Sequence, residues 1–298
     1  MFVFRVLVSL LIFETLVFGV PVVFDEGDGD GYPDYDTFKT LELLGDRIFG
    51  EPRPSSGTSV SQWTPTSDVF PEELGEYHEG DILHPYPSGR NGLRAKSSRW
   101  PNKTIPYEIS PYMRGADRQM IQEAIDEFHK HTCIKFKERR ESDFDYVYFT
   151  NGNTGCWSSV GRIGGRQEIN LQTPGCTSQR GTVIHEMLHA VGFMHEQNRP
   201  DRDKYVIINY QNIESGKESN FDKAQTETVD NQGIGYDYHS VMHYSGNAFS
   251  RNGRPTIEPK TRGVTMGQRK ALSKKDIQKV QKMYKCRKGN KHPSTFDD

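Results

Sequence analysis

Beyond its first 19 residues, the 298-residue chain lacks any apolar run of the roughly 18 residues that a helix needs to span a bilayer. This absence predicts a mature protein that is soluble and has no stable membrane insertion. Residues 1–19 carry one basic residue, Arg5, followed by an apolar stretch over 6–18 that Glu14 interrupts and that is short for a membrane anchor. The pattern is typical of a secretory signal peptide, and it predicts a secreted, extracellular protein.

Cysteine is scarce, with four in the whole chain: Cys133, Cys156, Cys176 and Cys286. An even number of cysteines in a chain bound for an oxidising compartment favours two disulfides over free thiols. The residues alone leave the three possible pairings open. The Asn-X-Thr acceptor at Asn102 fits an extracellular route and predicts a glycosylation site, although so short a motif also occurs by chance.

A large excess of one charge is also absent, since the formal net charge is −2, but the charge is unevenly distributed. Residues 20–90 contain 15 acidic and 4 basic side chains, whereas residues 91–298 contain 33 basic and 24 acidic ones. Opposite charges attract over roughly a Debye length, so residues 20–90 could be a pro-segment that lies on the domain it restrains. A disordered acidic leader explains the same charges equally well.

Residues 20–89 lack sustained apolar periodicity and are rich in Asp, Glu, Gly, Pro and Ser, so we expect a mostly irregular segment without its own core. The acidic run over 25–36 is similar to a calcium-binding EF-hand loop. A loop aligned on Gly31, however, would begin with Glu26 and end with Thr37 instead of the bidentate Glu that closes such loops. We therefore expect no calcium site there.

The apolar pattern becomes regular only after the first hundred residues. Alternating apolar residues predict a strand over 105–109, and helical spacing predicts a helix over 120–128. A second helix is expected from about residue 177 to 193, and Ser273 with Asp276 forms a capping box for a third helix. Further short strands are expected over 134–136, 146–149 and 168–171. Strands that are not interleaved with helices indicate an α+β domain.

A candidate metal site lies in the second predicted helix, where His185, Glu186 and His189 form a His-Glu-X-X-His motif. Residues four apart lie on one face of a helix with Cβ atoms about 5 to 6 Å apart, so both imidazoles can bind one Zn²⁺. Glu186 is then placed to act as general base on bound water without ligating the metal. The five-residue motif alone occurs by chance in roughly one of a hundred such chains.

Two further residues at fixed spacing make chance a poor explanation. Gly192 follows His189 by three positions, and His195 follows Gly192 by three more. Glycine can adopt a positive φ, end the helix and turn the chain, so that His195 reaches the metal from another direction. Three protein ligands leave one position open for water, which is the geometry of a catalytic zinc site. We therefore predict one Zn²⁺, bound by His185, His189 and His195.

A known family shares these features. Residues 240–244, Ser-Val-Met-His-Tyr, resemble the methionine turn of metzincins, although a lone Met such as Met242 is usually a core residue. Together with the string over 185–203, this segment resembles the astacin family of metzincins over residues 91–286. The resemblance implies an α+β, zincin-like catalytic domain with a twisted, mostly antiparallel sheet, an active-site helix and a C-terminal subdomain ending in a helix. Residues 287–298 would be a tail.

The resemblance also implies a latent precursor. Residues 79–82, Glu-Gly-Asp-Ile, are similar to a pro-segment motif in which an aspartate, here Asp81, occupies the water position on zinc. His78 stands where the family often has an aromatic residue, and Asp81 is otherwise one of 15 acidic residues. Tyr244 would ligate zinc at rest and bind the oxyanion during turnover.

Processing and disulfides follow from the same resemblance. Cleavage after Arg90, by a protease specific for basic residues, would leave Asn91 as the mature N-terminus, buried near Glu196. Arg94 and Arg99 are competing basic sites, and Glu196 is otherwise a solvated charge at a helix end. The family pairing of the cysteines would be Cys133 with Cys286 and Cys156 with Cys176.

Arg269 is a candidate specificity residue, because a similar Gly-Gln-Arg stretch in several astacin-like enzymes lines the pocket for the side chain after the scissile bond. Its planar fork suits bidentate contact with a carboxylate, which predicts a preference for Asp or Glu at that position. Alternatively, Arg269 is an exposed charge or pairs with a neighbour such as Asp276.

These features together predict a secreted zinc endopeptidase that acts on proteins or peptides, as a monomer, without nucleic-acid partners. A binding or matrix-assembly protein on an inactive protease scaffold would have lost the base, a ligand or the tyrosine, and none is lost. Few residues follow Cys286 in this sequence, so we expect no EGF-like or CUB-like module. Among enzymes, a zinc deacetylase or lipase is the alternative.

Overall fold

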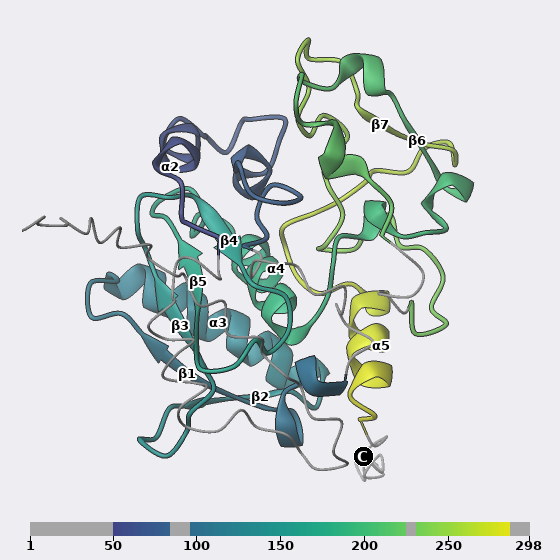
Figure 1. The fold of residues 1–298 in the computed structure, drawn as a ribbon. Coiled ribbons are helices and arrows are strands. Elements are labelled where there is room, and N and C mark those ends of the chain that lie inside the picture. The colour runs from purple at the N-terminus through teal and green to yellow at the C-terminus, as the bar shows by residue number, and fades with distance from the viewer. Residues whose placement is uncertain (1–49, 84–95, 225–230, 287–298) are drawn as a thin grey trace, which may run out of the picture.

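The computed structural model of the chain describes residues 50–83, 96–224 and 231–286 (Figure 1). The predicted signal peptide, the acidic run over 25–36, the cleavage site at Arg90 and Asn91, and the tail over 287–298 lie outside the described residues. Within the described part, no helix is both long and apolar enough to cross a membrane.

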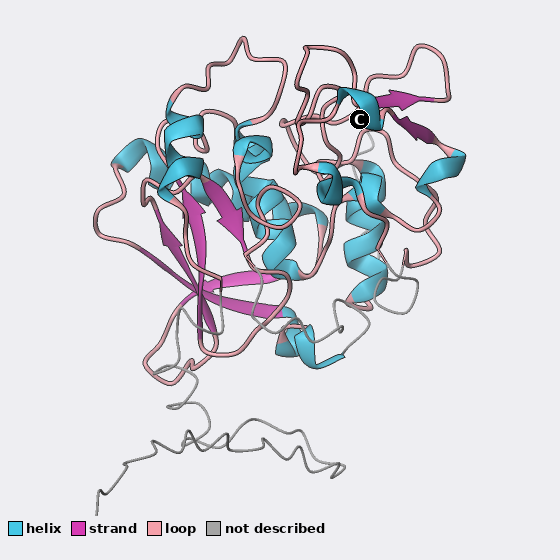
Figure 2. Cartoon of the chain, turned by 45° about the horizontal axis from the view of Figure 1, so that its top comes forward, coloured by secondary structure: helices cyan, strands magenta, loops and turns pink. Residues whose placement is uncertain are grey.

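A five-stranded sheet forms one side of the domain, with strand order β2-β1-β3-β5-β4 and a strong twist (Figure 2). The prediction of a mostly antiparallel sheet was wrong, because β1–β2, β1–β3 and β3–β5 pair in parallel and only β4–β5 is antiparallel. Helix α3 carries the chain from the end of β1 back to the start of β2, and such a crossover makes the two strands parallel. The strands are β1 (Thr104–Ile109), β2 (Lys135–Glu138), β3 (Tyr146–Thr150), β4 (Cys156–Ser158) and β5 (Arg166–Leu171).

Two helices pack beside this sheet. Helix α3 (Gly115–His131) buries Ile121, Ala124, Ile125 and Phe128, the face predicted from helical spacing. Helix α4 (Arg180–Val191) lies at the centre of the molecule, contacts α3, β4 and β5, and is buried on nearly every side (Figure 1). Complete burial makes the helix a rigid support for the side chains that it carries.

The C-terminal half contributes a small antiparallel pair, β6 (Val206–Ile208) and β7 (Ile257–Pro259), and helix α5 (Lys274–Met283). The predicted capping box of α5 is confirmed, since Asp276 N donates to Ser273 Oγ at 2.9 Å and Ser273 N donates to Asp276 Oδ2 at 3.0 Å. Short 3-10 helices cover Pro71–Leu74, Lys96–Ser98, Pro101–Lys103, Glu196–Asn198, Arg202–Lys204, Tyr210–Asn212 and Glu218–Phe221. The structure contains the disulfides Cys133–Cys286 and Cys156–Cys176, the pairing that the resemblance implied.

Residues 50–83, which we call the N-terminal segment, lie across the domain beside β4. They include helix α2 (Pro54–Ser61), which the composition did not predict, and its Val60 joins the main hydrophobic core. The segment then runs along the edge strand, where Ser158 N donates to Asp81 O and Leu83 N donates to Ser158 O, both at 2.9 Å. The segment therefore has no separate core but is anchored on the domain at several points.

Candidate metal centre

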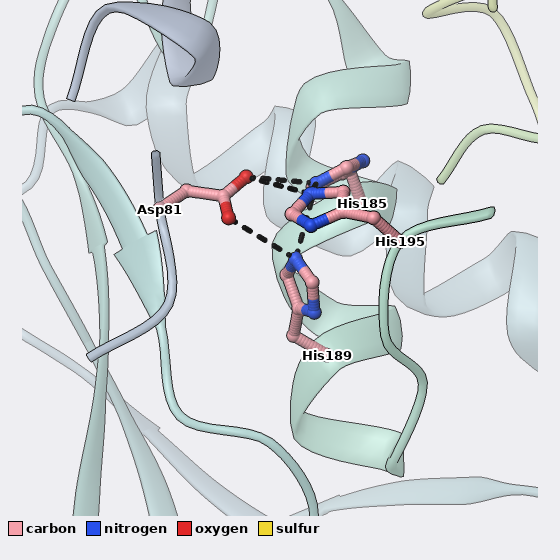
Figure 3. A group of neighbouring side chains, drawn as sticks. All are labelled: Asp81, His185, His189 and His195. Atoms are coloured by element: carbon pink, nitrogen blue, oxygen red, sulfur yellow. Dashed lines mark hydrogen bonds and ion pairs between the residues drawn. The ribbon is translucent and has the colours of Figure 1, made fainter. Parts of the chain in front are cut away.

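Helix α4 and the turn after it bring three imidazoles together. His185 and His189 lie one turn apart on α4, and Gly192 ends the helix with a φ of 123°. This conformation favours glycine, and it reverses the chain so that the His195 ring comes within 5.1 Å of His185 and 4.8 Å of His189 between ring centroids. Figure 3 shows the three rings facing one carboxylate, that of Asp81 from the N-terminal segment.

The hydrogen bonds of the rings direct the three Nε2 atoms at a common point. Each Nδ1 lies 2.7 Å from an oxygen, so each ring has an acceptor for an Nδ1 proton. The Nε2 of His185 lies 3.2 Å from the Nε2 of both other rings. Lone pairs at this distance repel each other unless a cation or a proton lies between them. The three acceptors are Val241 O for His185, Phe193 O for His189 and Glu79 Oε2 for His195.

The protonation of the cluster also shows its need for positive charge. Burial lowers the pKa of His185 to about 4, so its Nε2 is an acceptor. Burial would also lower the pKa of His195, but the carboxylates of Asp81 and Glu79 outweigh it and raise that pKa to about 9. Without a metal, a proton on His195 would have to supply the charge that the cluster requires.

Asp81 completes the donor set. Its Oδ2 lies 2.9 Å from His185 Nε2 and 3.4 Å from His195 Nε2, and its Oδ1 lies 3.4 Å from His189 Nε2. Burial raises the pKa of this carboxyl, but the imidazoles of His195 and His189 outweigh it and hold the pKa well below its usual range. The four donor atoms lie within 4.8 Å of one another, and Oδ1 has no hydrogen bond. Three nitrogens and one oxygen of this kind fit tetrahedral Zn²⁺.

Glu186 is buried beside this centre without a partner. Neither carboxylate oxygen has a hydrogen bond among the described residues. Burial and the charge of Asp81 raise its pKa well above the usual range, which makes the carboxylate a strong proton acceptor. A buried carboxylate left unpaired is costly, and such groups concentrate at sites that move protons.

The methionine-turn residues lie directly below the centre. Tyr244 is fully buried, with its ring 4.7 Å from the His195 ring, and its hydroxyl donates to the backbone oxygen of Glu79. Met242 is also buried and its carbonyl accepts from Glu196 N at 3.0 Å. The N-terminal segment thus holds the tyrosine hydroxyl as well as the Nδ1 of His195.

Glu196 is not the solvated charge that one reading allowed, because its side chain is only 4% exposed. It accepts from Asp237 N at 2.8 Å and forms ion pairs with Lys279 and with Arg199, the latter at 3.0 Å. Glu196, Arg199 and Lys279 line a cavity of about 40 Å³ that also touches Met242. A small cavity with a largely apolar lining and the buried carboxylate of Glu196 in its wall therefore lies beside Met242.

Arg269 is buried, so the expectation of an exposed charge was wrong. Its Nε pairs with Glu72 of the N-terminal segment, and its guanidinium lies 3.8 Å from the centre of the Phe70 ring. The alternative pairing with Asp276 was also wrong, because that carboxylate accepts from Ser240 Oγ at 2.6 Å and Val241 N at 2.9 Å.

Sequence reasoning missed most contacts of the N-terminal segment. Neither Glu72 nor Glu79 belongs to a periodic pattern that would indicate a buried contact. Glu79 does fall inside the motif over 79–82 that resembles the pro-segment motif of the family. Asn102, the glycosylation candidate, lies exposed in the 3-10 helix Pro101–Lys103, so its side chain is accessible for modification.

A buried helix with two histidines, a third histidine after a glycine turn, and a methionine turn beneath them define a zincin-type metallopeptidase domain. The chain belongs to the astacin family, since the model of the astacin peptidase family matches residues 92–285. Several relatives that it matches are named as zinc metalloproteinases, in agreement with the donor set of the site.

The chain is 47% identical over 197 residues to zinc metalloproteinase nas-13 of Caenorhabditis elegans, covering 66% of this chain and 43% of that protein. It is 40% identical over 223 residues to zinc metalloproteinase nas-4 of the same species, covering 72% of this chain and 70% of nas-4. Among solved structures, it resembles high choriolytic enzyme 1, a hatching enzyme zinc-protease of Oryzias latipes, with a TM-score of 0.61 and 38% identity, over 66% of this chain and all of that one. The chain spans less than half the length of several curated relatives.

Proposed function

We propose that the chain is a secreted, zinc-dependent endopeptidase that hydrolyses peptide bonds in proteins. The observation that carries the proposal is the convergence of three Nε2 atoms beside the unpaired carboxylate of Glu186. The names of the matched relatives, zinc metalloproteinases and a hatching enzyme zinc-protease, support the same chemistry.

His185, His189 and His195 would hold the zinc, which when bound polarises the scissile carbonyl and lowers the pKa of a bound water. Glu186 would take up the proton from the attacking water and pass it to the leaving amine, a role supported by its buried carboxylate, which has no hydrogen bond among the described residues. The Tyr244 hydroxyl, once free of Glu79, can donate to the oxyanion that forms on the substrate.

The N-terminal segment would be the end of a pro-segment over residues 20–90 that keeps the precursor inactive. Asp81 would supply the fourth donor to the metal and exclude water from that position. Cleavage after Arg90 by a protease specific for basic residues would release the segment, and a signal peptide over residues 1–19 would direct secretion. The new N-terminus at Asn91 would enter the cavity beside Glu196, where an α-ammonium finds a buried carboxylate.

The Arg269 guanidinium would select substrates with Asp or Glu after the scissile bond. It is buried one side chain away from the metal helix and has a carboxylate bound to it already, which supports an acid-binding role. The partners of the enzyme would therefore be protein or peptide substrates with an acidic residue at that position.

Mapping of cleavage sites tests the proposal. The activated chain is incubated with a denatured protein and with a peptide library, and the new termini are identified by mass spectrometry. We expect internal peptide bonds to be cut, the cutting to stop when a chelator removes the metal, and to resume when Zn²⁺ is restored. Deacetylation or ester hydrolysis without peptide cleavage would favour the alternative zinc hydrolases.

A further inference from the structure

The contact between Glu72 and Arg269 is fully buried, with both side chains excluded from solvent. Arg269 Nε donates to Glu72 Oε1, and the Thr182 hydroxyl donates to Glu72 Oε2 at 3.3 Å. Thr182 lies three residues before His185 in α4, which is about one helical turn, or roughly 4.5 Å along the axis. The Glu72 carboxylate therefore lies against α4, one helical turn before His185.

The pocket is held by the domain and not by the N-terminal segment. Arg269 Nη1 donates to the backbone oxygens of Gln268 at 2.9 Å and His243 at 3.3 Å. Gly181 N donates to Arg269 O at 3.0 Å, and a Cβ on Gly181 would lie 1.9 Å from the Arg269 backbone, so only glycine permits this approach. Arg269 would keep its place, without its ion pair to Glu72, if the segment left.

The guanidinium also has unused binding capacity. Arg269 Nη2 is buried and has no hydrogen-bond partner among the described residues. Among the described residues, Arg269 forms one ion pair within 4 Å, with Glu72. A buried donor of this kind is costly, and such a group is retained where a ligand is to be bound.

The segment is shaped to deliver Glu72 and Asp81 together. Glu73 accepts from Ser245 Oγ at 2.7 Å, and this bond fixes the turn that carries Glu72. A Cβ on Gly75 would lie 1.9 Å from Gly80 O, so the loop between the two acidic residues folds back on itself. The carboxylates of Glu72 and Asp81 are therefore presented to the domain by one compact loop.

We propose that Glu72 is a decoy for the acidic side chain of the substrate, and that Arg269 and Thr182 form the subsite that binds it. The proposal rests on the proposed acid preference of Arg269. It adds Thr182 as a second specificity-determining donor, and it makes the precursor blocked at two points, the metal centre and the acid subsite.

The first experiment measures how often the N-terminal segment detaches from β4 in the uncleaved, zinc-loaded precursor. The probe is hydrogen exchange at the amides of Ser158 and Leu83, which form the backbone hydrogen bonds between the segment and β4. Glu72→Gln should speed this exchange on the order of 10²-fold, because it removes the fully buried ion pair that joins the segment to Arg269. The matched control is Glu76→Gln, which removes an ion pair on the solvent-exposed side of the same segment and should leave the exchange unchanged.

Two checks keep this experiment decisive. Faster exchange in β1 and β3 as well would reveal unfolding of the domain, and in that case the double variant Glu72→Gln with Arg269→Gln is compared with each single variant. A double variant no more open than the singles shows that the two residues act through one contact. Additive effects, or wild-type exchange in a folded Glu72→Gln precursor, would overturn the decoy.

The second experiment uses the mature enzyme and a pair of peptides that differ only in Asp or Ala after the scissile bond. Thr182→Val should lower the ratio of the two kcat/KM values about 5- to 10-fold, whereas Thr182→Ser, which keeps the hydroxyl, should retain it. An unchanged ratio in Thr182→Val would overturn its role as a donor.

The two experiments separate this inference from the acid preference itself, because hydrogen exchange needs no substrate. A selective mature enzyme with an unaltered Glu72→Gln precursor would refute the decoy alone. Faster exchange in the Glu72→Gln precursor, combined with a mature enzyme that cleaves the Asp and Ala peptides equally well, would refute the acid preference. Glu72 would then only hold the segment on the domain and would not mimic a substrate side chain.

Discussion

Replacement of Asp81 by alanine in the uncleaved precursor should restore part of the activity before any processing. The Asp81 carboxylate lies 2.9 to 3.4 Å from the Nε2 atoms of all three histidines, and alanine leaves that position open to water. A charge-assisted contact of this kind contributes about 1.5 to 3 kcal/mol, so its loss should raise the open population of the precursor roughly 10- to 150-fold.

The activity should nevertheless stay well below that of the mature enzyme. The contacts of Glu72 with Arg269 and of Glu79 with His195, and the backbone bonds to β4, all remain in the variant. Each of these contacts still opposes opening, so we expect on the order of one per cent of the mature rate.

The assay follows a quenched fluorescent peptide, with Arg90→Ala added to every precursor so that no processing occurs, as checked by gel and mass. Asp68→Ala, at an exposed acidic residue of the same segment, is the matched control. An Asp81→Ala precursor as silent as its parent would mean that steric blockage suffices. An Asp81→Ala precursor as active as the mature enzyme would mean that the other contacts of the segment do not inhibit the enzyme.

Glu186→Gln should keep zinc bound, as measured by metal analysis, yet lower turnover by at least ~10²-fold, because the amide cannot take up a proton; wild-type kcat would refute the role of base. N-terminal sequencing of the active enzyme should begin at Asn91, and a start after Arg99 would exclude a buried terminus. The kcat/KM of the mature enzyme should be roughly 10- to 150-fold higher for a peptide with Asp after the scissile bond than for the same peptide with Ala there. Arg269→Ala should abolish this preference, and equal cleavage of both peptides by the wild type would refute the role of Arg269 in binding the acidic side chain. Burial raises the pKa of Glu73 from 4.5 to about 7, so the folded precursor holds this proton more tightly than the unfolded chain and its stability falls as the pH rises through that window. Glu73→Gln should flatten the profile of Tm against pH there, and an unchanged slope would contradict the assignment.

Local patterns were enough to predict the centre of the site. The spacing of His185, His189 and His195 specifies a helix face and a turn, and the structure brings the three rings together at Gly192. The capping box at Ser273 was equally readable. Such features involve residues within about ten positions of one another, so helix geometry and glycine conformation decide them before any tertiary contact forms.

The pairing of the strands and the partners of the buried charges were decided only by the tertiary structure. The parallel pairing of β1 with β2 depends on where α3 packs, which strand periodicity does not contain. Glu72 meets Arg269 across 197 positions of sequence, and Glu79 meets His195 across 116. By itself the sequence determined which residues can bind a metal and move a proton. Only the packing of the N-terminal segment against the domain decided that Arg269 pairs with Glu72 and His195 with Glu79, because no local period relates residues so far apart in the chain.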